Sequence, residues 1–414
     1  MFHLGHPRII WCPFNTPSET SFRNYPSFHQ LEQSKVRIYI RRQKVIKDFV
    51  TVEEVIVAAR NNVSLGAWGY LSGGSESETT LRRNRSALDR VAFRPRILRD
   101  VSSIDTSTTI LGHKVRIPLL LAPIGSQQVF TPEGAIAATK AANEFGALDV
   151  ISSVAEPSLE EIAAAADNPK IFQLYLHGDW EWTKSMLARI ESSGYSALCI
   201  TVDTARPSRR DRTMLARWSP RANFLASGSL NSHQVSGGKY GANASTVTWE
   251  TIDRIKELIK IPLIIKGVAT AEDAALALNH NFDMVWVSNH GGRQLDHGLG
   301  TIDTLPEIVD AIKGKVPIIV DGGIQRGTDI LKSIALGADA VAIGKLQCWG
   351  LAAAGSEGLV RVLEILEDEL ICAMALLGVT SMDELSSEYV CRAEAVTNPH
   401  EMSSWVNIPG NRIL

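Results

Sequence analysis

Short apolar runs and helical stretches alternate eight times along residues 118–377, and this alternation limits the fold more than any other feature. Runs that are apolar almost throughout are typical of parallel strands covered on both faces. Eight such pairs predict an α/β fold of the (β/α)8 TIM-barrel type, and a doubly wound open sheet is the alternative. The predicted strands cover residues 118–123, 148–152, 171–175, 197–202, 262–266, 284–288, 316–321 and 340–344.

Local start signals predict helices between these strands. Thr131 before Pro132 is typical of an N-cap followed by proline in the first turn. Ser158 with Glu161 matches a capping box. The predicted helices cover residues 132–145, 158–166, 179–192, 249–260, 271–279, 304–312, 327–335 and 357–377, with one more at 52–61 ahead of the barrel.

Two segments interrupt this pattern. Residues 70–76 contain the run Ser72-Gly73-Gly74-Ser75, which we expect to be too glycine-rich for regular structure. The polar segment 207–248 separates the fourth predicted strand from its helix, and a loop of this length is typical of a lid.

Composition and charge are those of an ordinary soluble globular protein. The net charge of −3, with 45% hydrophobic and 21% charged residues, gives no sign of nucleic-acid binding. No apolar run reaches about 18 residues, so we expect no membrane-spanning helix. The five cysteines lack a C-x-x-C pair, which favours a reducing compartment over a disulfide framework or a zinc site. We expect a cytoplasmic protein, and peroxisomal and mitochondrial locations stay open.

The chain divides into three predicted parts. Residues 1–48 carry eight basic residues, three acidic residues and four prolines. The prolines interrupt any long amphipathic helix, so we expect a flexible extension, and a transit peptide is the alternative. Residues 49–395 form the predicted barrel domain, and residues 396–414 form a C-terminal tail. The final residues, Arg412-Ile413-Leu414, do not make a clean peroxisomal signal.

Polar residues gather at the ends of the predicted strands, where the active site of a barrel is built. His290 and Arg293 follow the sixth strand, separated by Gly291 and Gly292. A histidine suits proton abstraction, and an arginine suits a carboxylate beside it. The pairs Gly322-Gly323 and Gly344-Lys345 end the last two strands, as a phosphate site in a barrel requires. Other polar strand ends are Ser152, Gln173, Tyr175, Thr201, Asp203, Lys266 and Asp321.

With these motifs the chain resembles the FMN-dependent α-hydroxy-acid oxidase/dehydrogenase family, which includes glycolate oxidase and lactate oxidase. The resemblance covers about residues 50–390. It rests on Tyr70 with Ser72-Gly73-Gly74, Arg94-Pro95-Arg96, Gln173-Leu174-Tyr175, Thr201-Val202-Asp203-Thr204, Arg209-Arg210, Lys266-Gly267, the run from Ser288 to Asp296, Asp321-Gly322-Gly323 and Gly327-Thr328-Asp329.

The resemblance implies a role for each matching position. His290 would be the catalytic base, oriented by Asp203. Arg293 and Arg210 would hold the substrate carboxylate, and Tyr70 and Tyr175 would bond the substrate around its hydroxyl and carboxylate. The FMN ring would contact Ser152, Gln173, Thr201, Lys266 and Ser288, and the FMN phosphate would contact Asp321, Gly322, Gly323, Gly344 and Lys345. The resemblance also implies a homotetramer.

Three positions depart from the family pattern. Gln325 stands where the family usually has an arginine for the FMN phosphate, and Arg326 beside it is a candidate replacement. Lys345 replaces a second arginine, which exchanges a two-donor fork for a point charge. Val154 stands where glycolate oxidase-like members carry a bulky aromatic residue, so we expect a wider substrate pocket.

The function we expect is FMN-dependent oxidation of an L-2-hydroxy acid to the 2-oxo acid, with O2 as acceptor and H2O2 as product. The alternatives within catalysis are a monooxygenase of the lactate 2-monooxygenase type, an oxidase of a larger specialised metabolite, and a dehydrogenase with a protein or quinone acceptor. A non-catalytic FMN-binding barrel is the alternative from another class.

Overall fold

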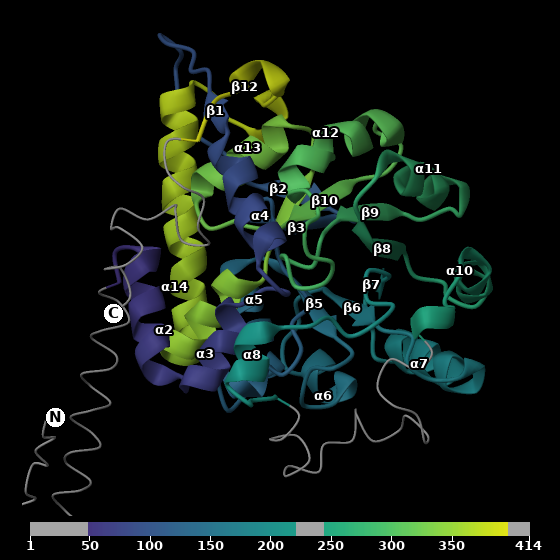
Figure 1. Ribbon diagram of the computed structural model, residues 1–414. Helices are drawn as coiled ribbons and strands as arrows, with labels where there is room; N and C mark the ends of the chain where they lie inside the picture. Colours follow the sequence, from purple (N-terminus) through teal and green to yellow (C-terminus); the bar gives the residue numbers. More distant parts are fainter. Residues whose placement is uncertain (1–48, 221–243, 396–414) are drawn as a thin grey trace, which may run out of the picture. The chain divides into compact units, whose positions relative to one another are not determined.

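The computed structural model describes residues 49–220 and 244–395. Within them, eight parallel strands close into a barrel (Figure 1). Strand β11 pairs with β4 and so completes the ring. This closure confirms the predicted TIM barrel and rules out the open sheet. The strands are β4 (Leu119–Leu121), β5 (Leu148–Ser152), β6 (Lys170–Leu174), β7 (Ala197–Thr201), β8 (Leu263–Val268), β9 (Met284–Val287), β10 (Ile318–Asp321) and β11 (Ala340–Ile343).

A helix follows each strand at the place where the sequence predicts one. The helices are α5 (Ala135–Phe145), α6 (Leu159–Ala163), α7 (Trp180–Ser192), α10 (Trp249–Lys256), α11 (Ala271–Asn279), α12 (Thr301–Ile312), α13 (Gly327–Ala335) and α14 (Lys345–Leu377). The capping box of Ser158 and Glu161 is confirmed at the start of α6. The predicted cap at Thr131 is wrong, because Gly134 turns the chain with φ 57° and α5 begins after it.

Two further helix starts differ from the prediction by more than one residue, and α6 and α10 end three and four residues before their predicted ends. α12 begins at Thr301, three residues before its predicted start. Its N-cap residue is Gly300, which has no side chain to form a cap, so the sequence gives no capping signal there. α14 begins at Lys345 and is interrupted at Ala354 and Gly355, which have non-helical backbone angles.

Helices and short strands flank the barrel. α2 (Val52–Asn62) begins with a capping box between Thr51 and Glu54. α3 (Leu65–Ser72) contains Tyr70, so the prediction that residues 70–76 lack regular structure is wrong for its first three residues. The remaining described elements are α4 (Thr79–Asp89), β1 (Val91–Phe93), β2 (Thr108–Ile110), β3 (His113–Val115), η1 (Gln127–Val129), α8 (Asp211–Leu215), η2 (Ala244–Thr246), η3 (Met382–Glu384), η4 (Ser387–Tyr389) and β12 (Val390–Arg392).

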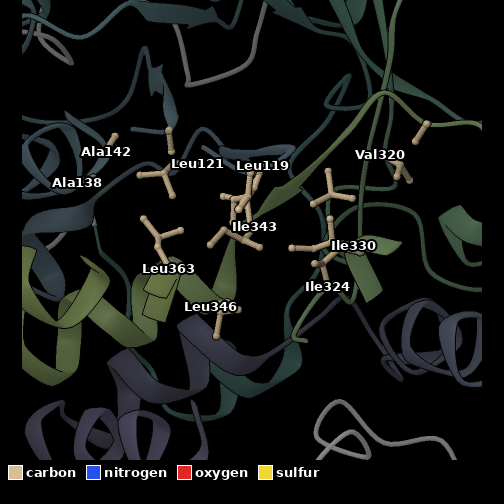
Figure 2. Packing of buried hydrophobic residues seen from close by; sticks show 14 of the residues in the cluster. Leu119, Leu121, Ala138, Ala142, Val320, Ile324, Ile330, Ile343, Leu346 and Leu363 are labelled. Atoms are coloured by element: carbon tan, nitrogen blue, oxygen red, sulfur yellow. The ribbon is translucent and has the colours of Figure 1, made fainter. Parts of the chain in front are cut away.

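Alternate residues of each strand face opposite sides of the barrel wall. Leu120 faces the barrel interior, where it joins a cluster with Ile319 and Trp286. Leu119 and Leu121 belong to the outer cluster, which packs strands against helices (Figure 2). Each such side chain, when fully buried, stabilises the fold by about 1.5–3 kcal/mol. The barrel therefore has a solid interior, and the site must lie at its rim.

The expected extension at 1–48, the expected tail at 396–414 and most of the predicted lid lie outside the described residues. Of the predicted lid, α8 and η2 belong to the described part. Among the described helices, none is both long enough and apolar enough to cross a membrane.

Candidate active site

His290 lies just after β9, between an aspartate and a tyrosine. Its Nδ1 lies 3.0 Å from Oδ1 of Asp203, and its Nε2 lies 3.4 Å from the hydroxyl of Tyr175. The backbone of His290 has φ 59°, a left-handed conformation that is uncommon outside glycine. Such conformations concentrate at functional sites, where the surrounding structure holds them.

The charges around His290 suit a base at neutral pH. Burial lowers the pKa of His290, and this outweighs the opposing effect of Asp203. Burial alone would raise the pKa of Asp203, but His290 beside it holds that pKa below its usual value. The ionised Asp203 accepts from Nδ1–H, which assigns the proton to Nδ1 and leaves the Nε2 lone pair able to take one.

Two arginines flank the ring of Tyr70. The guanidinium carbon of Arg293 lies 4.9 Å from the ring centre, and that of Arg210 lies 6.0 Å from it. Arg293 donates through one terminal nitrogen to the backbone carbonyls of Tyr70 (2.7 Å) and Gly73 (2.9 Å). Burial, followed by repulsion from Arg210, lowers the pKa of Arg293 to about 10. Arg293 therefore stays a cation at neutral pH, and an anion between the two guanidinium groups would relieve their repulsion.

Lys266 forms a buried ion pair beneath the cavity. Its Nζ donates to Ser288 Oγ (2.6 Å) and lies 3.1 Å from Asp321 Oδ2. Burial alone lowers the pKa of Lys266, but Asp321 and Asp203 outweigh it and hold that pKa above its ordinary value. Trp286 donates to the same Asp321 carboxylate from inside the barrel (3.0 Å). The site therefore presents a fixed ammonium group, although Lys266 lies within β8 rather than at its predicted end.

Two buried polar atoms above the barrel interior have no protein partner. Ser152 Oγ donates to Gln173 Oε1 (2.9 Å), which leaves Gln173 Nε2 to face elsewhere. Within the described residues, Gln173 Nε2 and Thr201 Oγ1 are buried without a hydrogen bond. Buried polar groups are normally satisfied, so these two atoms indicate a bound polar group. They fit the edge of the flavin ring that the resemblance implies.

The turn after β10 requires glycine. Gly322 and Gly323 have φ 106° and 85°, and a Cβ on Gly322 would lie 2.7 Å from Thr301 Oγ1. Arg85 holds this turn, because it donates to the carbonyl of Gly323 (2.9 Å) and to Asp329 (2.7 Å). Gly322 and Gly323 line the cavity, so the backbone of this turn can approach a bound group, as a phosphate site requires.

Of the two cations expected near the FMN phosphate, Lys345 lines the cavity and Arg326 does not. Lys345 lines the cavity and donates to the carbonyl of Gly291 (3.1 Å). Gln325 also lines it, and its backbone N–H donates to Asp329 (2.9 Å). Arg326 instead pairs with Glu369 at 2.7 Å and is not among the lining residues. The idea that Arg326 replaces the missing arginine is therefore not supported.

A cavity of about 780 Å³ connects these groups. Its wall includes the predicted site residues Tyr70, Val154, Tyr175, Arg210, Lys266, His290, Arg293, Asp321, Gly322, Gly323, Gln325, Gly344 and Lys345. The other predicted residues, Ser152, Gln173, Thr201, Asp203 and Ser288, are not in its wall. Asp203 and Ser288 bond the wall residues His290 and Lys266, and Ser152 Oγ accepts from the backbone N–H of Val154 (3.3 Å). Among the described residues, no group of three or more His, Cys, Asp or Glu side chains could hold a metal ion.

Several wall residues were not predicted from the sequence. Trp218 packs against Tyr70, with ring centres 5.3 Å apart, and the ring of His177 stacks on Tyr175 at 5.2 Å. Glu156 lies two residues beyond Val154, and its Oε1 is buried without a partner among the described residues. Trp218, in the segment expected to be a lid, carries no motif signal. The alternation of side chains along β9 places Trp286 inside the barrel, so the position of Trp286 could have been predicted from the sequence.

Comparisons with known proteins agree with this geometry. The family described as FMN-dependent dehydrogenase matches residues 59–392. Glycolate oxidase 1 of Zea mays is 38% identical over 353 residues, which cover 83% of this chain and 96% of the relative. L-lactate oxidase of Nostoc sp. is 38% identical over 347 residues, covering 80% and 95%. A crystal structure of mandelate oxidase with benzoyl-formic acid superposes with a TM-score of 0.76 at 35% identity, covering 84% of this chain and 100% of that one.

Proposed function

The chain belongs to the FMN-dependent dehydrogenase family, and on this premise we propose that it oxidises an L-2-hydroxy acid to the 2-oxo acid, with FMN as cofactor and O2 reduced to H2O2. One observation carries the proposal. A neutral histidine, oriented by an aspartate, lines the same cavity as two arginine cations. This arrangement matches a substrate that has a removable proton next to a carboxylate.

His290 performs the proton transfer. If the C2 hydrogen leaves as hydride, Nε2 removes the hydroxyl proton; if C2 loses a proton first, Nε2 removes that one. Either transfer creates an imidazolium, which Asp203 stabilises through the Nδ1 bond (3.0 Å). The hydroxyl of Tyr175 lies 3.4 Å from Nε2, where it orients the substrate oxygen against the base.

The two arginines orient the substrate. Arg293 and Arg210 bind the carboxylate as a pair of charged donors, and both lie close to the ring of Tyr70. Fixing the carboxylate fixes C2 and its hydroxyl in front of Nε2, and such positioning is a large part of the rate enhancement.

The residues present suit FMN. Ser152, Gln173, Thr201 and Lys266 would hold its ring, and Ser288 would position Lys266. The glycine turn, with Gly344, Lys345 and Gln325, would hold its phosphate. FMN, when bound, accepts the two electrons of the substrate and passes them to O2.

Val154 and its surroundings support a substrate larger than glycolate. Val154 lines the cavity, and beyond it the wall continues to Glu156 and His177. A related mandelate oxidase has been crystallised with benzoyl-formic acid, an aryl 2-oxo acid. We therefore propose that long-chain or aryl 2-hydroxy acids are better substrates than glycolate.

The assembly and location of the protein are further proposals. Exposed apolar side chains at Ile97, Leu98 and Leu376 lie beside the backbone bond between Arg96 and Leu377 (3.0 Å). An exposed apolar group of this kind favours self-association, in line with a homotetramer, which light scattering would test. A cytoplasmic location fits the free Cys199 and Cys348, and a fluorescent fusion would test it. Residues 49–395 are the proposed catalytic domain.

The test of function uses the purified holoenzyme. A yellow protein that bleaches when 2-hydroxy acids are added without O2, and that makes one H2O2 per turnover in air, supports the oxidase. Bleaching without H2O2, but with a decarboxylated product in air, would indicate a monooxygenase. A yellow protein that no 2-hydroxy acid bleaches would contradict the proposal.

A further inference from the structure

Ser208 joins the two arginines of the site. Its hydroxyl donates to the backbone carbonyl of Arg293 (2.6 Å) and accepts from Nε of Arg210 (3.2 Å). A serine hydroxyl has one proton to donate and lone pairs to accept with, so both bonds form together. Ser208 lies in the segment between β7 and α8, whereas Arg293 follows β9. The hydroxyl therefore ties two segments that are 85 residues apart in the sequence.

Each arginine is held by one part of its guanidinium group. Arg210 uses Nε for Ser208, and Arg293 uses NH1 for two backbone carbonyls. Among the residues that the structure describes, the two terminal nitrogens of Arg210 make no hydrogen bond, and neither do Nε and NH2 of Arg293. Each side chain thus keeps a two-donor edge, the shape that matches a carboxylate.

The arginines also repel one another, and the pKa of Arg293 is depressed partly for this reason. Without a restraint, Arg210 would be expected to swing away from Arg293 in the absence of an anion. Among the described residues, the guanidinium group of Arg210 has one restraint besides the ring of Tyr70, namely the bond that its Nε donates to Ser208 Oγ. α8, which Arg210 precedes, has no buried residue that would hold the segment rigidly.

We propose that Ser208 is a positioning residue for substrate binding: it fixes the guanidinium of Arg210 so that its two terminal nitrogens face the substrate carboxylate beside Arg293. This inference rests on the proposed function, because it takes the carboxylate of a 2-hydroxy acid as the ligand. Ser208 does not touch the reacting atoms. Its effect passes through Arg210.

The first test is Ser208→Ala in the FMN-bound enzyme. Because the bond holds a charged group, its loss is expected to raise KM about tenfold. The kcat should stay within about threefold, because Arg293 keeps its bonds to Tyr70 and Gly73 and still aligns the carboxylate once the substrate is bound. Ser208→Thr retains the hydroxyl and should restore KM to near the wild-type value. Ser196→Ala is the matched control: it removes a hydroxyl that donates to the carbonyl of Lys170 (2.9 Å), and KM should not change.

A double-mutant cycle separates positioning from general damage to the fold. In an Arg210→Met background, Ser208→Ala should have no further effect on KM or on the Kd of benzoyl-formic acid measured by flavin absorbance. The proposal would be overturned if each substitution raised KM independently, so that the two effects multiplied in the double variant. An unchanged KM in Ser208→Ala, or a lower melting temperature with no change in KM, would overturn it as well.

The failure of this proposal can be told from the failure of the proposed function. If 2-hydroxy acids reduce the wild-type flavin and Ser208→Ala behaves like wild type, only the role of Ser208 is lost. If no 2-hydroxy acid reduces the wild-type flavin, the proposed function is contradicted, and the role of Ser208 with it.

Discussion

The Nδ1 of His290 donates a hydrogen bond to Oδ1 of Asp203 at 3.0 Å, across 87 residues of sequence. This bond fixes the imidazole in one tautomer and directs the lone pair of Nε2 toward the cavity and the hydroxyl of Tyr175. The chemistry proposed for the site depends on this bond.

The pH dependence of kcat/KM should show an acid limb set by His290. The imidazole must be neutral to act as a base, and burial lowers its pKa in the folded protein. Activity should therefore be full above the folded pKa and fall as the pH drops through it. The midpoint should lie below the ordinary histidine value of about 6.5. Steady-state kinetics between pH 4.5 and 8 check this, and a midpoint above about 7 would contradict the assigned environment.

Arg293→Lys should lower kcat/KM by roughly 10- to 100-fold, the range expected for losing a hydrogen bond to a charged group. The guanidinium bonds Tyr70 and Gly73 through one nitrogen and keeps a two-donor edge. A single ammonium group cannot satisfy both the backbone and the carboxylate. Both KM and kcat should suffer, because the substrate is held less tightly and less well aligned. Wild-type kinetics in this variant would mean that Arg210 binds the carboxylate alone.

Gln325→Arg should tighten FMN binding by about tenfold, since it adds a cation near a doubly charged phosphate. Gln325 lines the cavity, whereas Arg326 pairs with Glu369 at 2.7 Å. Arg326→Gln is the matched control and should leave the FMN dissociation constant unchanged. Fluorescence titration of the apoprotein measures both constants. A loss of FMN affinity in Arg326→Gln would show that Arg326 serves the phosphate after all.

Val154 should set the size of the preferred substrate. Each methylene that fills spare apolar space is worth about 0.8 kcal/mol, or roughly fourfold in kcat/KM. We expect kcat/KM to rise from glycolate through lactate to longer or aryl 2-hydroxy acids. Val154→Trp should reverse this order, and Val154→Ala should preserve it. An unchanged ranking in Val154→Trp would show that residue 154 does not limit the pocket.

The repeating part of the fold was predictable because its signal is local. β5, α11 and α13 match their predicted bounds to the residue. Two of the misses involve glycine: α3 continues to Ser72, although Gly73 and Gly74 follow it directly, and Gly300 precedes α12 without a side-chain cap.

The residues alone predicted His290 as a base, Arg293 for a carboxylate and glycine strand ends for a phosphate, and the other site roles came only through the resemblance. Spacing alone cannot pair His290 with Asp203, because the fold brings together residues on different strands. The contacts specific to this chain, such as Ser208 between Arg210 and Arg293, needed side-chain geometry. The sequence predicted Lys266 at the end of a strand, but β8 continues past it. The pairing of β8 with β9 shifts its register between Lys266 and Val268.

The most direct test of the account is anaerobic stopped-flow reduction of the flavin in His290→Ala. We expect this variant to fold and bind FMN but to be reduced at least 10²- to 10⁴-fold more slowly than wild type, the usual cost of removing a general base. His280→Ala is the matched control, because His280 also bonds an aspartate, Asp253, through Nδ1 (2.6 Å) but lies outside the cavity wall. It should be reduced at the wild-type rate. Reduction of His290→Ala within tenfold of wild type would contradict the assignment of His290 as the base.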